Sequence, residues 1–302
     1  MKYWTFIQAR CWRIYPLYGL VVLAAVLAMK SDIIGYVQQM LLLTPTAWPG
    51  TMFGQTWSIV IEFQFYLAFP ILTLLMAREG KLSLLMIVAF LVILRFGLWV
   101  MGYDVNHLGY WSLIGRADQF LIGMVAASIY RNGQARLLAN WFAFVASLVF
   151  LALVVQYFHN IYGHAFPWEQ EPMTHWFSII WPDAQAIAFA LLVLSFLQLP
   201  ARIPAFIEKP AFFVGTISFS IYIVHRIIEL ILAKELAWRA LSFTSYAKLN
   251  VFLTCTLIEL PIILAVATLA YYAIERPFHK FKRSYKIERS KTQPGKTLVP
   301  TS

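Results

Sequence analysis

Residues 82–101 read LSLLMIVAFLVILRFGLWVM, a run of apolar side chains in which Arg95 is the single ionisable residue. A helix needs about 20 consecutive apolar residues to cross the hydrocarbon core of a bilayer. Within that core a segment has to be helical, because only a helix satisfies all of its own backbone hydrogen bonds. The stretch therefore predicts a transmembrane helix.

The composition extends this prediction to the whole chain of 302 residues, of which 61% are hydrophobic and 13% are charged. Soluble domains carry about 25% charged residues, and the mean hydropathy here is +0.69. These values exclude a disordered chain, a coiled coil, a nucleic-acid-binding module and an ordinary cytosolic enzyme. The predicted fold class is all-α: a polytopic transmembrane bundle of about eight spans, at 14–29, 57–76, 82–101, 117–130, 140–157, 179–198, 212–233 and 250–274.

The charges predict an orientation. Lysine and arginine favour cytoplasmic loops, and most of them fall on one side if the N-terminus is inside. An even number of spans then places both termini in the cytoplasm. We expect one membrane domain over 1–276 and a disordered basic tail over 277–302 that faces anionic lipid. The apolar segment 33–43 is too short to cross, so it is expected to be interfacial or re-entrant. The bacterial inner membrane is the expected location.

Two arginines stand at the inner mouth of the first predicted span. Arg10 and Arg13 have i, i+3 spacing, which puts both guanidinium groups on one helix face. Forked donors of this kind suit a polyphosphate ligand that arrives from the cytosol. An ordinary positive-inside anchor would explain the same residues.

A polar stripe opens the second predicted span. Ser58, Glu62 and Tyr66 recur every four residues and share one face. A carboxylate at this depth needs a partner or a proton, and either state is useful in proton-transfer chemistry. The alternative is a structural Glu62 that pins neighbouring helices.

A second stripe lies in the seventh predicted span, where Ser218, Tyr222, His225 and Glu229 follow one face. Glu229 could orient His225 as a base, although a buried, hydrogen-bonded histidine is equally compatible with the spacing. Further ionisable or polar candidates are Arg95, Arg116 with Asp118, Asp183 with Gln185, and Glu259. Because charges in hydrocarbon are costly, Arg95 and Glu259 are expected to pair with opposite charges on neighbouring spans.

The six histidines show no HExxH or other metal-ligand spacing, so no metal site is expected. The two cysteines, Cys11 and Cys255, indicate neither a metal site nor a disulfide framework.

Five motifs together resemble the acyltransferase 3 family of integral membrane O-acyltransferases. They occur in the family's order, as RCWRIYP (10–16), WSIVIEFQFY (57–66), RADQFLIG (116–123), ISFSIYIVH (217–225) and IERP (274–277). The resemblance implies transfer of an acyl group, commonly acetyl, from acyl-CoA on the cytoplasmic side to a hydroxyl of an outward-facing carbohydrate or lipid-linked glycan. No bound cofactor is implied.

The resemblance also implies roles for individual residues. Arg10 and Arg13 would bind the acyl donor, and Glu62 would belong to the polar core near the acceptor. Glu62 and His225 are the candidate catalytic residues. The supporting polar core would comprise Trp57, Ser58, Tyr66, Arg116, Tyr222 and Glu229.

One departure from the family concerns the beginning of the chain. Family members have about ten spans, and the first carries a histidine taken as catalytic, whereas this sequence begins at what resembles the third span. His225 and His107 occupy other positions. Three explanations are open: a misassigned start or truncated gene, a naturally short and inactive homologue, or a variant with another base, for which His225 beside Glu229 is the candidate.

A non-catalytic function is the alternative hypothesis. A carrier or flippase for a lipid-linked sugar could use Glu62, Arg95 and Glu259 around a cavity between aromatic-rich spans. Many transporters contain internal repeats, and the lack of a visible repeat in this sequence counts against that hypothesis.

Overall fold

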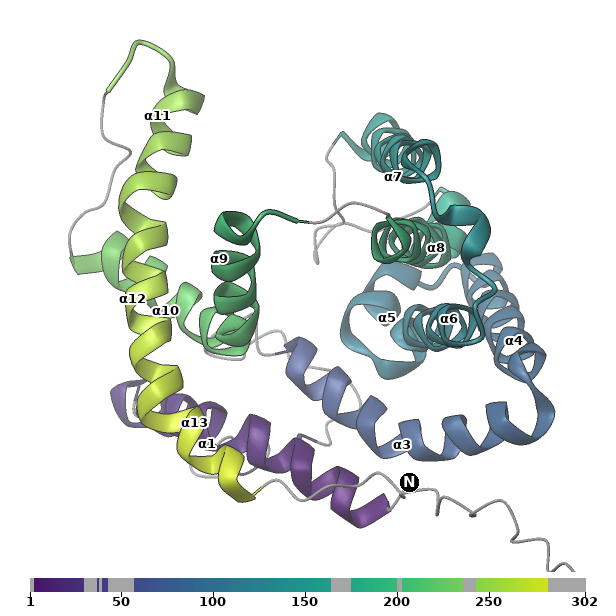
Figure 1. Ribbon diagram of the computed structural model, residues 1–302, viewed down its shortest axis with the longest axis horizontal. Coiled ribbons are helices and arrows are strands. Elements are labelled where there is room, and N and C mark those ends of the chain that lie inside the picture. Colours follow the sequence, from purple (N-terminus) through teal and green to yellow (C-terminus); the bar gives the residue numbers. More distant parts are fainter. Residues whose placement is uncertain are drawn as a thin grey trace, which may run out of the picture.

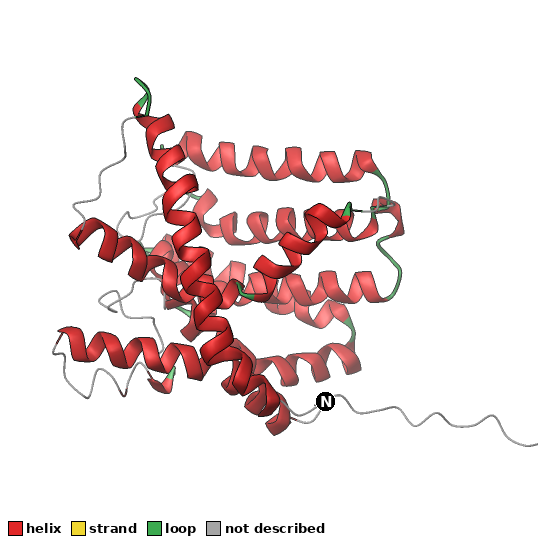
Figure 2. Ribbon diagram, turned by 60° about the vertical axis from the view of Figure 1, so that its left-hand side comes forward, coloured by secondary structure: helices red, strands yellow, loops and turns green. Residues whose placement is uncertain are grey.

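The computed structural model describes residues 3–29, 37, 40–42, 57–163, 175–199, 203–235 and 243–281. Every regular element in these residues is a helix, and no β-strand occurs among them (Figure 2). The predicted all-α fold class is confirmed. The main helices are α1 (Tyr3–Met29), α3 (Trp57–Glu79), α4 (Lys81–Val100), α5 (Val105–Trp111), α6 (Leu113–Arg131), α7 (Trp141–Tyr162), α8 (Phe177–Gln198), α9 (Ala205–Thr216), α10 (Ser218–Glu235), α11 (Ala247–Thr254), α12 (Leu260–Ala270) and α13 (Arg276–Phe278).

The last helices form one long rod. Two π-helical turns, Cys255–Glu259 and Tyr271–Glu275, join α11, α12 and α13 into a stretch from Ala247 to Phe281. A 3₁₀ turn at His279–Phe281 closes it, so the first residues of the predicted tail continue this rod. The rest of that tail lies outside the described residues, as does the predicted interfacial segment 33–43 except residues 37 and 40–42.

Several helices can cross a membrane. Among the described residues, α3, α4, α7, α8 and the rod Ala247–Phe281 are long and apolar enough, and α9 with α10 passes the same test as a pair bent by 69°. These six coincide with six of the eight predicted spans. The other two predictions, 14–29 and 117–130, fall on α1 and α6, which are helical but are not among the six. In α6 the first two turns carry Arg116 and Asp118, which lower its apolarity.

The helices pack in two groups that share α3. Figure 1 shows α4, α6, α7 and α8 side by side, with α10 and α12 standing apart from them and α1 alongside α3. One apolar cluster joins α1, α3, α10 and α12 around Tyr18, Ile59, Ile223 and Ala267. A second joins α3, α4 and α6, and a third joins α7 to α8. Because α3 contributes to the first and second clusters, it fixes one group against the other.

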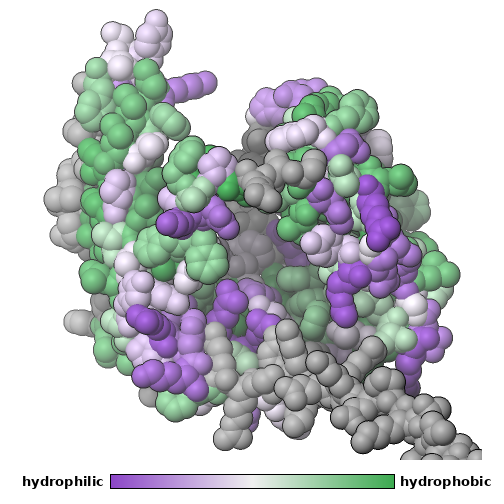
Figure 3. Space-filling view, viewed as in Figure 1, coloured by the Kyte–Doolittle hydropathy of each residue, from purple (hydrophilic) through white to green (hydrophobic). Residues whose placement is uncertain are grey.

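The outer surface is apolar. Phe142 on α7 is 83% exposed and Phe206 on α9 is 77% exposed. Figure 3 shows apolar residues along the rod of α11 and α12 as well. Large exposed apolar patches are rare on soluble monomers and mark interaction with protein or membrane. Together with the six apolar helices or helix pairs, this surface defines an integral membrane protein.

Candidate functional site

A cavity of about 220 Å³ lies where α1, α3 and α10 meet. Three helices that are distant in sequence each supply polar side chains to it. The lining consists of Arg13 and Ile14 from α1, Ser58, Ile59, Glu62 and Tyr66 from α3, and Ser218, Phe219 and Tyr222 from α10. Six residues singled out in the sequence therefore lie around one space, namely Arg13, Ser58, Glu62, Tyr66, Ser218 and Tyr222.

The α3 wall follows from the four-residue spacing of its polar side chains. Ser58, Glu62 and Tyr66 all line the cavity, as expected for residues on one helix face. The Tyr66 hydroxyl donates a hydrogen bond to Oε1 of Glu62. This bond fixes the orientation of the carboxylate towards the cavity.

The α1 wall brings positive charge to the same place. Arg13 lines the cavity directly. The Arg10 guanidinium lies 4.9 Å from the ring centre of Tyr66 and 4.9 Å from that of Phe6. Cations are attracted to the faces of aromatic rings at such distances. Both arginines therefore approach the α3 side of α1, in agreement with their i, i+3 spacing.

The α10 wall is tied to α3 and to the last helix. The hydroxyls of Tyr222 and Ser58 share a hydrogen bond that links α10 to α3. On another face of α10, buried Ser220 donates to Oε1 of Glu275, which is also buried. The bend after α9 allows the first turn of α10, with Ser218 and Phe219, to face the cavity.

Two further predicted core residues lie next to the cavity and do not line it. The Arg116 guanidinium is 5.0 Å from the ring centre of Trp57, and the Trp57 ring packs edge-on against Trp111 at 5.9 Å. Trp57 directly precedes Ser58 at the start of α3. The aromatic pair connects α5, and the Arg116 contact connects α6, with the end of α3 that carries the site.

The expected pairing of His225 with Glu229 needs a correction. The carboxylate of Glu229 accepts a hydrogen bond of 2.8 Å from Arg226, three residues earlier on α10. The Nδ1 atom of His225 lies 2.7 Å from the backbone carbonyl oxygen of Tyr222 and faces its own helix. Neither side chain lines the cavity. The side chains of Arg226 and Glu229 are 51% and 36% exposed, so the two pair with each other at the surface of α10.

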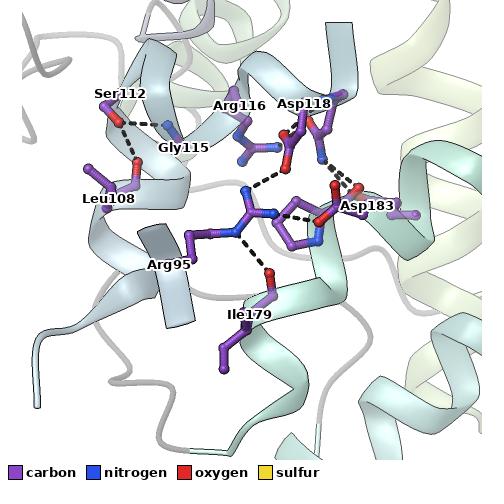
Figure 4. A network of polar contacts seen from close by, with 11 residues as sticks. Arg95, Leu108, Ser112, Gly115, Arg116, Asp118, Ile179 and Asp183 are labelled. Atoms are coloured by element: carbon purple, nitrogen blue, oxygen red, sulfur yellow. Dashed lines mark hydrogen bonds and ion pairs between the residues drawn. The ribbon is translucent and has the colours of Figure 1, made fainter. Parts of the chain in front are cut away.

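The expected opposite charge beside Arg95 is present twice (Figure 4). Buried Arg95 on α4 forms ion pairs with Asp118 on α6 and Asp183 on α8. Its Nε donates to the carbonyl oxygen of Ile179 at 2.8 Å. The sequence indicated these residues one by one, and the structure assembles them into a single cluster. By contrast, the expected opposite charge beside Glu259 is not found among the described residues, where Glu259 lies beside Cys255 on its own rod.

Sequence reasoning overlooked the buried pair of Ser220 and Glu275. Glu275 stood inside the IERP motif, and a carboxylate next to an apolar span is a signal that could have drawn attention to it. The apolar lining residue Phe219 carries no such signal. In the described part of the chain, no group of three or more His, Cys, Asp or Glu residues could hold a metal ion.

Comparison with known families agrees with this architecture. A family model described as an acyltransferase domain matches residues 1–276. The chain therefore belongs to the acyltransferase 3 family and is a membrane acyltransferase by family. Neither curated proteins nor solved structures give a match.

Proposed function

We propose that this protein transfers an acyl group, acetyl in the first instance, from acyl-CoA to a hydroxyl of a cell-surface or exported carbohydrate. The observation that carries the proposal is the cavity in which a carboxylate, a guanidinium and four hydroxyl groups line one space. A group transfer of this kind needs a base for the hydroxyl and positive charge or donors for the oxyanion. Family membership supplies the reaction class.

Glu62 is the proposed base. The acceptor hydroxyl oxygen attacks the thioester carbonyl carbon while its proton passes to the Glu62 carboxylate. The carbon–sulfur bond then breaks, and the departing thiolate takes that proton, so the carboxylate is regenerated. The hydrogen bond from Tyr66 supports this role because it orients the carboxylate.

Positively charged side chains would bind the acyl donor, and a hydroxyl donor would stabilise the oxyanion. Arg10 and Arg13 would bind the phosphates of acyl-CoA, since guanidinium groups match phosphate geometry. Of the hydrogen-bonded hydroxyls of Ser58 and Tyr222, the one that accepts from the other would donate its own proton to the oxyanion. Both hydroxyls stand on the cavity wall, joined to each other.

The size of the cavity supports a short acyl group. Pockets that enclose drug-sized ligands measure roughly 300–1,000 Å³, and this cavity measures about 220 Å³. It has room for the reacting ends of donor and acceptor, with the bulk of each outside.

The experiment uses membranes that contain the full chain, acyl-labelled CoA and a bacterial glycan extract. We expect Glu62→Gln to lower the rate of label transfer by about 10²–10⁴-fold, the usual contribution of a general base. Arg13→Ala should lower kcat/KM by about 10–100-fold, which corresponds to the loss of a hydrogen bond to a charged group.

Matched controls come from the far end of α3, where Arg78 and Glu79 are exposed. Arg78→Ala and Glu79→Gln should transfer label at the wild-type rate. Equal activity of Glu62→Gln and Glu79→Gln would refute the role of Glu62. Movement of glycan across the membrane without any acylation would favour the carrier hypothesis.

A further inference from the structure

Outside the cavity, three ionisable side chains meet between α4, α6 and α8 (Figure 4). Arg95, Asp118 and Asp183 are 2%, 0% and 8% exposed, and each comes from a different helix. One guanidinium therefore faces two carboxyl groups in a place that water barely reaches. Charged groups are rarely buried in this way unless they are fully compensated.

The two carboxyl groups stand next to each other on one guanidinium. Nη1 of Arg95 pairs with Oδ2 of Asp118, and Nη2 of Arg95 pairs with Oδ2 of Asp183. Ionised carboxylates only accept hydrogen bonds, so neither of the two could donate to the other. In addition, Oδ1 of Asp183 is buried and has no hydrogen-bond partner within the described residues. A proton on one of the carboxyl groups would remove both difficulties.

We propose that Asp118 and Asp183 share one bound proton and that Arg95 holds this proton site between α4, α6 and α8. With the proton present, the three side chains carry no net charge. Without it, two like charges stand side by side in a medium of low dielectric constant, where their repulsion is strong. The ligand of this site is a proton taken from water.

The charged and polar side chains next to this proton site have hydrogen bonds and ring contacts of their own. Arg116 is a second cation two residues from Asp118, but its guanidinium lies over Trp57 and donates to Oε1 of Gln119 at 3.3 Å. The amide of Gln119 in turn donates to the Gln185 side chain at 3.3 Å and to the Pro182 carbonyl at 3.5 Å. Neutral amides thus separate Arg116 from α8.

Other titratable groups on the packed helices are engaged elsewhere or stand apart. On α3, Glu62 accepts from Tyr66 in the cavity. On α7 the ionisable side chains are Tyr157, His159 and Tyr162, and the first two are exposed. Tyr162 donates to the His175 carbonyl at 3.4 Å. The α5 helix carries His107, whose side chain lies outside the described set.

A proton shared by Asp118 and Asp183 makes the stability of the fold depend on pH. A folded state that holds a proton which the unfolded chain has released loses stability as the pH rises. Asp183→Asn replaces the protonated carboxyl group by a neutral amide of the same shape, which can donate to Asp118. Its melting temperature should therefore vary less with pH between 5 and 9 than that of the wild type.

The direct test is infrared spectroscopy of the purified full-length protein. We expect the wild type at pH 7 to show a carbonyl band of a protonated carboxylic acid that shifts in D₂O and disappears at alkaline pH. This band should be missing in Asp183→Asn or Asp118→Asn and unchanged in the exposed control Glu79→Gln.

Two results would overturn the proposal. The first is a band component that is identical in the wild type and in both Asp variants, or a wild type without any such band. The second is a melting temperature of the wild type that rises with sodium but not with choline at equal ionic strength, while the melting temperatures of the variants do not respond to sodium. A metal cation, and not a proton, would then occupy the site. If neither variant folds, the alkaline titration of the wild-type band decides.

Discussion

At the scale of single residues, two arginines show how burial decides the importance of an ion pair. Arg95 is 2% exposed and faces two carboxyl groups, whereas the Arg226 side chain is 51% exposed and pairs with Glu229 one turn away. Removal of one partner from a buried pair leaves an uncompensated charge. Exposed pairs contribute little because water screens them.

We expect Arg95→Leu to lower the free energy of unfolding by about 3–5 kcal/mol. Arg226→Leu, the matched change on the surface, should alter it by less than about 1 kcal/mol. Denaturant unfolding in detergent micelles, followed by tryptophan fluorescence, measures both. Equal losses in the two variants would show that the Arg95 cluster is not a structural centre.

Much of the cavity could be predicted from the sequence, because an ionisable residue in a membrane span is costly and usually has a partner or a function. Glu62 stood out on that ground, and helical periodicity added Ser58 and Tyr66 to it. Periodicity failed for His225 and Glu229, because Arg226 also lies within reach of Glu229 and the spacing cannot rank the two contacts. The bond from Ser58 to Tyr222 joins residues 164 positions apart, and only tertiary packing determines it.

At the scale of helices, the junction of α5 and α6 depends on one glycine. A Cβ atom at Gly115 would lie 2.2 Å from the carbonyl oxygen of Leu108, so no side chain fits there. The backbone N–H of Gly115 donates to the Ser112 side chain at 3.0 Å, which caps α6. This tight turn fixes the beginning of the helix that carries Arg116 and Asp118.

Gly115→Ala should therefore destabilise the protein by about 1–3 kcal/mol through overpacking. Gly123 offers the control on the same helix, because a Cβ there meets nothing within 4 Å. Gly123→Ala should stabilise by about 0.5–1 kcal/mol through helix propensity. Thermal unfolding of the two variants measures the contrast, and the same sign for both would contradict this description of the junction.

Hydropathy predicted where helices occur better than where they bend. The predicted span 212–233 contains the end of α9, Ile217 and most of α10, with a 69° change of direction. At the bend a glycine and two hydroxyl residues, Gly215, Thr216 and Ser218, interrupt the apolar run, but they leave the hydropathy of the segment high enough to resemble one straight span. Likewise, the sequence of α6 does not reveal the partners of its charged side chains, because Asp118 pairs with Arg95 on α4 and Arg116 lies over Trp57 on α3.

At the scale of the whole molecule, the charge distribution predicts that both termini face the cytoplasm. A reporter active only in the cytoplasm should work when fused after Ser302, and a periplasm-specific reporter at the same position should not. With the N-terminus inside, the segment between the predicted spans 140–157 and 179–198 lies outside. A third fusion within this segment, at residues 164–174, therefore serves as the control of opposite sign. Activity of the periplasmic reporter at Ser302 would invert the topology and separate Arg10 and Arg13 from any cytosolic donor.

The break between α9 and α10 has an electrical consequence for the cavity beside it. A helix begins with backbone N–H groups that lack intrahelical partners, and its macrodipole adds about half a positive charge there. Because α9 ends at Thr216 and α10 begins at Ser218 on the cavity wall, the negative end of one helix dipole lies beside the positive end of the other. The main chain therefore adds a local dipole to the cavity that no change of pH can titrate, whereas the net charge of the cavity depends on Arg13 and Glu62.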